Sequence, residues 1–249
     1  MKLRRWLLPS RFLLPILCAA PAFAQMVPKI SVGLEQAKSP QEASIALQVV
    51  FLLTILSVAP AILLLMTPFT RIVTVLGFLK KALGTQTTPP NQIIVGLSLF
   101  LTWFVLQPQI KEINDTALQP YLAQQIGWKD GLERAMKPMR TYMLRQTGEN
   151  ELATMVRISH TPRPHNVDDI PNAVLIPSYV VSELKSAFLI GFLIYLPFLV
   201  IDMVVASVLM SLGMMMLPPV MVSLPLKLIL FVSVDGWNLV THGLIQSFH

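Results

Sequence analysis

The sequence of 249 residues is 54% apolar and only 13% charged, with a mean hydropathy of +0.63. Soluble domains usually carry about a quarter charged residues, so this composition favours a membrane protein. The formal charge of +6 could indicate a nucleic-acid partner, but four of the 19 basic residues lie in the first eleven positions (Lys2, Arg4, Arg5 and Arg11). The remaining 15 basic residues face 13 acidic ones and form no persistent basic face, so no nucleic acid is expected as a partner.

Residues 1–24 are typical of a cleaved signal peptide. Their basic start is followed by an apolar core, Leu13 to Ala20, and by the small-x-small cleavage site Ala22-Phe23-Ala24. The alternative is an uncleaved first span, which is disfavoured because three prolines interrupt a segment already too short to cross a bilayer. Cleavage would also remove Cys18, the single cysteine, so the mature chain would form no disulfide.

Four long apolar tracts follow, and they predict an all-α membrane protein built from helical hairpins. The first hairpin is expected over residues 25–110, with helical segments at about 43–68 and 91–110. The second hairpin is expected over residues 186–249. Its two tracts are separated by a glycine and by a pair of helix-breaking prolines, which mark the predicted turn (Gly213, Pro218 and Pro219).

The charges beside the tracts predict their orientation. Arg71, Lys80 and Lys81 lie between the first two spans without an acidic residue, so the positive-inside bias places this loop in the cytoplasm. A cleaved signal peptide places the mature N-terminus outside, which gives the first span the same direction. Residues 111–185 are then a small α-helical segment in the periplasm.

This outer segment is expected to be a packing or oligomerisation module. Asp130 to Gly148 is predicted as helical, because apolar residues recur there at three- and four-residue intervals (Leu132, Met136, Met139 and Met143). Pro138 is expected to divide the helix into two pieces. Arg157 to Pro177 contains four prolines and is predicted as a connector or loop.

The sequence contains no motif typical of an enzyme. Gly-rich phosphate loops, HExxH, cysteine pairs and nucleophile elbows are all absent. His160 and His165 are separated by Thr-Pro-Arg-Pro, which is not helical and offers no third ligand, so solvated loop histidines are the better interpretation. We therefore expect no catalysis, metal or cofactor.

Ionisable residues interrupt or border the last apolar tracts (Glu183, Lys185, Asp202, Lys227 and Asp235). A charge at the bilayer centre costs at least about 2.5–3.5 kcal/mol, so such residues usually face protein, a partner or water. For Asp202 a buried contact between helices is the favoured interpretation, and a role in proton or ion coupling is the alternative. Glu183 and Lys185 could instead lie at the level of the lipid headgroups.

Methionine is concentrated around the predicted turn. Six of the thirteen methionines lie between Met203 and Met221, and Met203, Met210 and Met214 share one helical face. Ordinary core packing explains most methionine stripes, but it explains the consecutive residues Met214, Met215 and Met216 poorly, because a helix would point them in three directions. Flexible thioethers at a hairpin tip, contributed by several subunits, would form a deformable apolar seal.

Several stretches resemble the FliP family of type III secretion export gate proteins. The most specific are residues 177–192 and 197–219, and the resemblance continues through 223–228 and 234–237. It extends upstream through residues 66–72 and 85–92, so that it covers nearly all of the mature chain.

This resemblance implies a subunit of the export gate at the base of the bacterial flagellum, in the inner membrane. Further FliP copies would assemble with FliQ, FliR and other membrane proteins of the export apparatus into a closed channel for unfolded substrate proteins. Met214 to Met216 would belong to a gasket that narrows this channel, and Glu183 and Lys185 would be candidates for ion pairs between subunits. In this family the assembled hairpins are lifted largely out of the bilayer plane, so hydropathy describes the inserted precursor.

Two other functions are compatible with the residues. The equivalent subunit of a virulence injectisome belongs to the same class, although the signal peptide and the long outer segment favour the flagellar subunit. An ion or small-molecule transporter, with Asp202 as its coupling site, belongs to another class.

Overall fold

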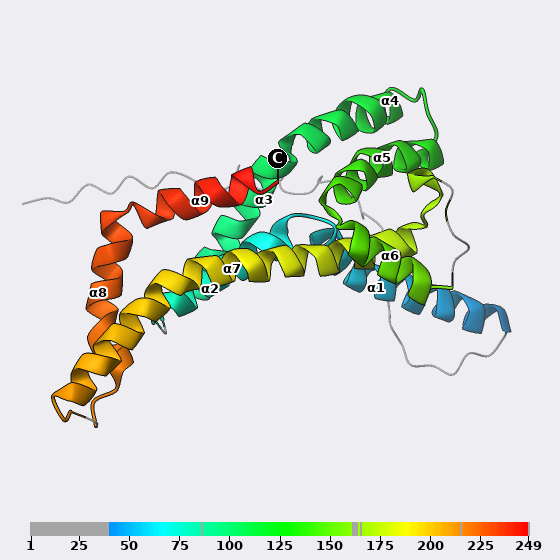
Figure 1. Cartoon of the computed structure of the whole chain (residues 1–249). Coiled ribbons are helices and arrows are strands. Elements are labelled where there is room, and N and C mark those ends of the chain that lie inside the picture. The colour runs from blue at the N-terminus through cyan, green and yellow to red at the C-terminus, as the bar shows by residue number, and fades with distance from the viewer. Residues whose placement is uncertain (1–39, 86, 161–163, 165, 215, 249) are drawn as a thin grey trace, which may run out of the picture. The chain divides into compact units, whose positions relative to one another are not determined.

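The computed structural model describes residues 40–85, 87–160, 164, 166–214 and 216–248 (Figure 1). The expected signal peptide, His165 and Met215 therefore lie outside the described residues. The chain divides into two compact units, Met1–Val50 and Phe51–His249. The described part of the first unit is the start of one helix, and the rest of the description concerns the second unit.

All regular elements in the described residues are helical, as the sequence predicts. They follow one another as α1 (Pro40–Leu65), α2 (Phe69–Ala82), α3 (Asn91–Ile113), a π-helical turn η1 (Asn114–Leu118), α4 (Gln119–Leu122), α5 (Trp128–Gln146), α6 (Glu149–Ile158), a 3-10 turn η2 (Val167–Asp169), α7 (Asn172–Ser211), α8 (Pro219–Ser233) and α9 (Gly236–Gln246).

Three helical stretches are long and apolar enough to cross a membrane: Leu47–Leu65, Asn91–Leu122 and Asn172–Ser211. A fourth crossing is possible if α8 and α9 form one broken span, with a bend of 65° between them. The bend falls at Asp235, whose left-handed backbone (φ 49°) interrupts the helical hydrogen bonding. The described chain thus offers three or four apolar spans.

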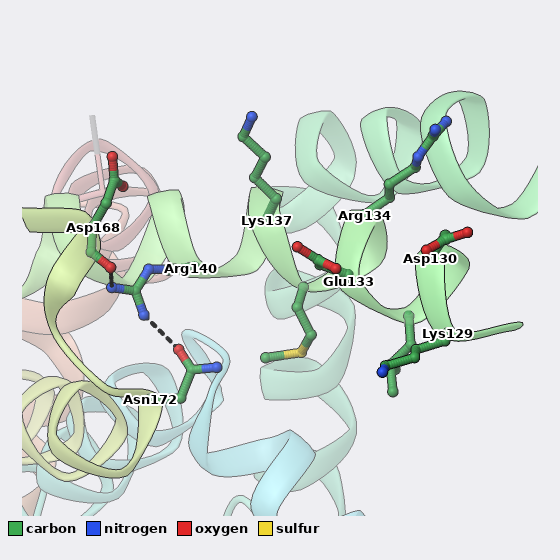
Figure 2. A pocket seen from close by; sticks show the side chains of 10 residues that line it. Lys129, Asp130, Glu133, Arg134, Lys137, Arg140, Asp168 and Asn172 are labelled. Atoms are coloured by element: carbon green, nitrogen blue, oxygen red, sulfur yellow. Dashed lines mark hydrogen bonds between the residues drawn. The ribbon is translucent and has the colours of Figure 1, made fainter. Parts of the chain in front are cut away.

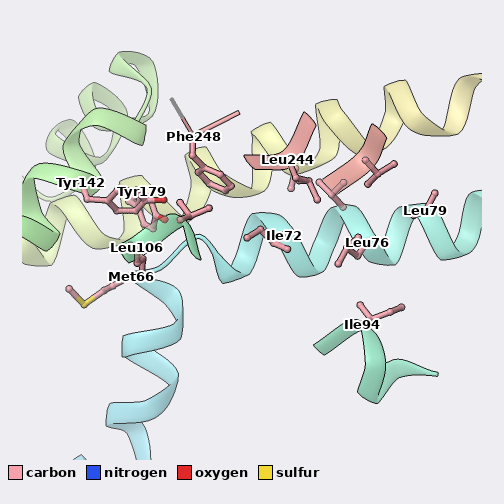
Figure 3. Close-up of a cluster of buried hydrophobic side chains, with 14 of the residues drawn as sticks. Met66, Ile72, Leu76, Leu79, Ile94, Leu106, Tyr142, Tyr179, Leu244 and Phe248 are labelled. Atoms are coloured by element: carbon pink, nitrogen blue, oxygen red, sulfur yellow. The ribbon is translucent and has the colours of Figure 1, made fainter. Parts of the chain in front are cut away.

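The main core lies where α2 packs along α7. Figure 3 shows Ile72, Leu76 and Leu79 of α2 in this cluster, together with Leu244 and Phe248 from the end of the chain. From its charges, this stretch was predicted only as a cytoplasmic loop between spans. Its apolar residues recur with helical spacing and are buried, so the connection is an amphipathic helix.

Two further expectations about helix limits were wrong. Pro138 does not divide its helix, because α5 continues through it from Trp128 to Gln146. Proline removes one backbone hydrogen bond, and here its ring is buried, so packing offsets that loss. The expected connector before the third tract also ends early, since α7 begins at Asn172 and includes Pro177.

Candidate functional site

The turn between α7 and α8 lies at the residues predicted for it. Gly213 adopts φ 73°, a conformation that favours glycine. Its N–H donates to the carbonyl of Met210 at 3.1 Å, and the N–H of Met214 donates to that of Leu209 at 2.9 Å. This pair of bonds is a Schellman motif, which ends α7. Pro218 and Pro219 then start α8, where proline is tolerated because the first N–H groups of a helix lack partners.

The methionine side chains that the structure describes at this tip are exposed within the chain. Met210 is 60% exposed, Met214 43% and Met216 99%, so they add little to the chain's own core. Met203 and Met221 are exposed as well. A soluble monomer rarely presents such a contiguous apolar surface, which usually marks a contact with protein or membrane.

Behind the tip, a polar cluster joins α7 to α8. Lys227 Nζ lies 2.6 Å from Asp202 Oδ2, and Ser223 Oγ donates to Asp202 Oδ1 at 2.5 Å. Ser223 and Lys227 are four residues apart, so they share one face of α8 and both are buried. The carboxylate of Asp202 is therefore held as the counter-ion of a lysine of the same chain.

A second ion pair, between Arg71 and Glu183, lies almost completely buried between α2 and α7. The guanidinium contacts the carboxylate through Nε at 2.9 Å and Nη2 at 2.6 Å, and the side chains are 4% and 0% exposed. Arg71 also donates to the carbonyl of Ser247 and to Gln146 Oε1, and it lies 4.2 Å from the centre of the Phe248 ring. One side chain thus links α2, α5, α7 and the end of the chain.

Glu183 was predicted as a contact residue from its place beside an apolar tract, whereas Arg71 was predicted only to mark the orientation of the spans. The helical spacing of the apolar residues could have indicated that Arg71 is buried, because it places Arg71 beside Ile72 on the apolar face of α2. The partner itself could not be found by spacing, because the two residues are 112 positions apart.

The other two predicted ionisable residues lie in more exposed places. Lys185 donates to Glu151 Oε1 at 2.7 Å and is 66% exposed. The hydrogen bond from this lysine lowers the pKa of Glu151 below its usual value. Asp235 is exposed between α8 and α9, and its carboxylate accepts a hydrogen bond from Asn238 Nδ2 at 3.1 Å.

A surface hollow of about 820 Å³ lies along α5 (Figure 2). Its lining mixes basic residues such as Lys129 and Lys137 with acidic ones such as Asp130 and Glu133, so it offers no charge of a single sign. Arg140 carries no signal in the sequence that marks it as important. It donates to Asn172 Oδ1 at 2.6 Å and to three backbone carbonyls of the connector before α7. This arginine therefore fixes the start of α7.

No group of three metal-ligating side chains gathers within the part of the chain that the structure describes. The regions that stand out are the methionine tip and the two ion pairs beneath the apolar helices.

Comparison with known proteins identifies the family. Residues 52–244 match the FliP family model, a range that runs from α1 into α9 and includes the tip and the ion pairs Arg71–Glu183 and Lys227–Asp202. The chain belongs to the FliP family. It is 48% identical over 217 residues to the flagellar biosynthetic protein FliP of Bacillus subtilis (strain 168), covering 87% of this chain and 98% of that protein.

Other FliP proteins show similar identity. The flagellar biosynthetic protein FliP of Pectobacterium carotovorum is 51% identical over 209 residues, or 84% of this chain and 81% of the relative. That of Caulobacter vibrioides is 46% identical over 236 residues, or 94% and 87%. As a FliP protein, the chain is a flagellar biosynthetic protein and a component of the type III export apparatus.

Proposed function

We propose that the chain is a pore-forming structural subunit of the flagellar export gate. Several copies assemble with FliQ and FliR in the bacterial inner membrane, and the complex conducts unfolded export substrates. Met210 and Met214 to Met216 form the apolar seal of the closed channel. The chain itself performs no catalysis.

The observation that carries this proposal is the distribution of polar and apolar groups along α7 and α8. The ionisable groups Glu183, Asp202 and Lys227 have counter-ions inside the chain, while large apolar side chains remain outside. Only 11% of the most apolar window of α7 is buried within the chain. Such a helix needs lipid or other subunits to cover it.

The exposed tip favours other subunits as part of that cover. Lipid-facing helices are rich in branched aliphatic residues and need no particular side chain at a turn. Methionine is unbranched and polarizable, so copies that meet at one axis can close against one another and re-form after a substrate has passed.

The membrane topology belongs to the same proposal. Residues 1–24 are removed as a signal peptide, residues 111–185 lie in the periplasm, and the α2 end that carries Lys80 and Lys81 lies on the cytoplasmic side. Arg71 does not count toward this bias, because it contacts Gln146 and Glu183 of the segment placed in the periplasm. Lys80 and Lys81 alone therefore mark the cytoplasmic side in this proposal.

Replacing Met214, Met215 and Met216 with alanine tests the seal. Met214 and Met216 are exposed, so folding should be retained while the closed gate becomes permeable to small ions. The measurement is ion conductance across the membrane of cells that make the complete export apparatus.

A matched control replaces three exposed apolar residues of α1, outside the α7–α8 hairpin (Leu52→Ala, Leu56→Ala and Leu63→Ala). This variant should keep the conductance of the closed complex low. Unchanged conductance in the triple methionine variant, with the subunit present at its normal level, would exclude the seal.

A further inference from the structure

A groove of about 740 Å³ lies between α2 and the start of α3. Lys80 and Lys81 lie at one end of its lining, where α2 finishes. Apolar surface from Val73 and Gly77 of α2 and from Ile94 and Val95 of α3 lines a second part, and Gly84, Thr85 and Asn91 complete the lining. The groove is therefore cationic and polar where α2 ends, and apolar along Val73, Gly77, Ile94 and Val95.

The two lysines differ from the cations buried under the apolar helices. Arg71 and Lys227 each contact a carboxylate, whereas neither Lys80 nor Lys81 forms an ion pair with any described residue. Lys80 Nζ donates to Asn91 Oδ1 at 2.9 Å, and Lys81 Nζ lies 5.9 Å from the centre of the Phe78 ring. The described lining contains no acidic residue. Two positive charges thus remain without a counter-ion at the mouth of the groove.

The apolar part of the groove has open space beside Gly77. A Cβ atom added at this glycine would meet nothing within 4 Å. Val95 on the opposite wall is 42% exposed, so an apolar chain laid along the groove would remove this surface from contact with water.

We infer that the groove binds an anionic phospholipid, with its phosphate at Lys80 and Lys81 and an acyl chain along Val73, Gly77 and Ile94. Basic pockets between membrane helices recognise anionic headgroups, and the oxygens of one phosphate can accept hydrogen bonds from both lysines. A free phosphate would use the lysines but not the apolar walls. The inference rests on the membrane location given under the proposed function.

Native mass spectrometry of the detergent-solubilised protein, titrated with phosphatidylglycerol or phosphatidylcholine, tests this site. The unmodified protein should bind phosphatidylglycerol more tightly. Lys80→Gln with Lys81→Gln should weaken that binding about 25-fold, which corresponds to about fivefold for each lysine near a lipid headgroup. The control Lys129→Gln with Lys137→Gln removes the same charge from α5 and should change nothing.

Gly77→Leu fills the apolar part of the groove without changing its charge, and it should weaken phosphatidylglycerol binding as well. Gly96→Leu is the matched control, because Gly96 also has open space around it but does not line the groove. Both substitutions replace a helical glycine, so neither should prevent folding.

Equal binding of the two lipids, or unchanged binding by both the double lysine variant and Gly77→Leu, would overturn the inference. Displacement of the lipid by inorganic phosphate at equal concentration would do so too, since it would leave no role for the acyl chain. Oligomer mass appears in the same spectra. If the unmodified protein is only monomeric but still prefers phosphatidylglycerol, the proposed export gate is contradicted and the lipid site is not. If it forms oligomers but binds the two lipids equally, the lipid site is contradicted and the export gate is not.

Discussion

At the residue scale, Arg71 and Glu183 illustrate how a charged pair can be kept beneath apolar helices. Their bidentate contact is supported by Gln146 and by the carbonyl of Ser247, so nearly every polar group of the pair has a partner. A buried ion pair of this kind stabilises the fold little more than apolar side chains of the same size would. Removing only one member is strongly destabilising, because it leaves the other charge buried without a counter-ion.

We predict that Glu183→Gln destabilises the protein by about 3–5 kcal/mol, because it leaves the Arg71 guanidinium buried without a counter-ion. The double replacement Arg71→Met with Glu183→Met should cost clearly less, since it removes both charges together. Thermal unfolding in detergent measures both effects. A double variant as unstable as Glu183→Gln would show that the hydrogen bonds to Gln146 and Ser247, and not charge pairing, stabilise this junction.

The ion pair between Glu151 and Lys185 gives a pH-dependent prediction. The pKa of Glu151 is lowered from 4.5 in the folded chain, so the pair contributes stability above that pH. The contribution is lost as the pH falls through the lowered pKa. Because Lys185 is largely exposed, the effect should be small.

The measurement is the unfolding temperature of the unmodified protein and of Glu151→Gln across pH 7 to 3. The unmodified protein should be slightly more stable at neutral pH, and the two curves should meet at acidic pH. Lys185→Gln should reproduce the behaviour of Glu151→Gln. If the two curves stay parallel down to pH 3, the ionisation of Glu151 does not contribute to stability through its ion pair with Lys185.

At the element scale, the contact between α2 and α7 depends on a glycine. A Cβ atom at Gly191 of α7 would lie 2.5 Å from Cδ2 and 2.7 Å from Cγ of Phe78. The Phe78 ring is itself held edge-on against Phe188, with the ring centres 5.3 Å apart. The ring therefore has little freedom to withdraw, and the helices would have to separate.

We predict that Gly191→Ala destabilises the protein by about 1–3 kcal/mol through overpacking. The control is Gly243→Ala in α9, where an added Cβ atom meets nothing within 4 Å. It should stabilise the protein by up to about 1 kcal/mol, because alanine is the better helix former. Thermal unfolding of the two variants should move in opposite directions, and equal shifts would contradict the close approach of the two helices.

Helices could be predicted from the sequence wherever apolar residues form long tracts or repeat with helical spacing. The turn at Gly213 and Pro218-Pro219 was placed correctly because glycine and proline act locally on the backbone. Pro138 was misjudged for a related reason: its local effect is real, but packing around the buried ring offsets it. Local preference is a weak guide where tertiary contacts are strong.

The partners of the ionisable residues could not be predicted, although the need for them could. Hydropathy identified Asp202 and Lys227 as misplaced charges, and the structure pairs them across the α7–α8 turn. Glu183 was equally conspicuous, but its partner belongs to a helix far away in the sequence. That a buried charge needs a partner follows from the residue and its apolar neighbours in the sequence. Which residue is the partner depends on how the helices pack in three dimensions.

At the scale of the whole molecule, α7 and α8 present more apolar surface than a single chain can cover. Phe188, Phe192 and Val204 of α7 and Ile229 and Val232 of α8 are all more than half exposed. The ionisable residues of these helices have counter-ions within the chain, but the exposed apolar side chains have no described part of the chain packed over them. This imbalance is expected of a subunit that completes its core by assembly.

The arrangement of the tip in the assembly leads to the last prediction. If several copies close a channel with their methionines, the same residue of neighbouring copies is brought close to one axis, and transient approach of two Cα atoms to within about 7 Å is enough for a disulfide to form. With Cys18 replaced by alanine, a cysteine introduced by Met216→Cys should therefore form cross-linked dimers on oxidation in cells that make the complete export apparatus. Asn150→Cys, which is exposed on α6, is the control and should remain monomeric. Gel electrophoresis without reductant reads out both variants. Cross-linking at position 150 but not at 216 would mean that the copies meet through the outer segment while their tips stay apart, and the methionines could then not seal a pore.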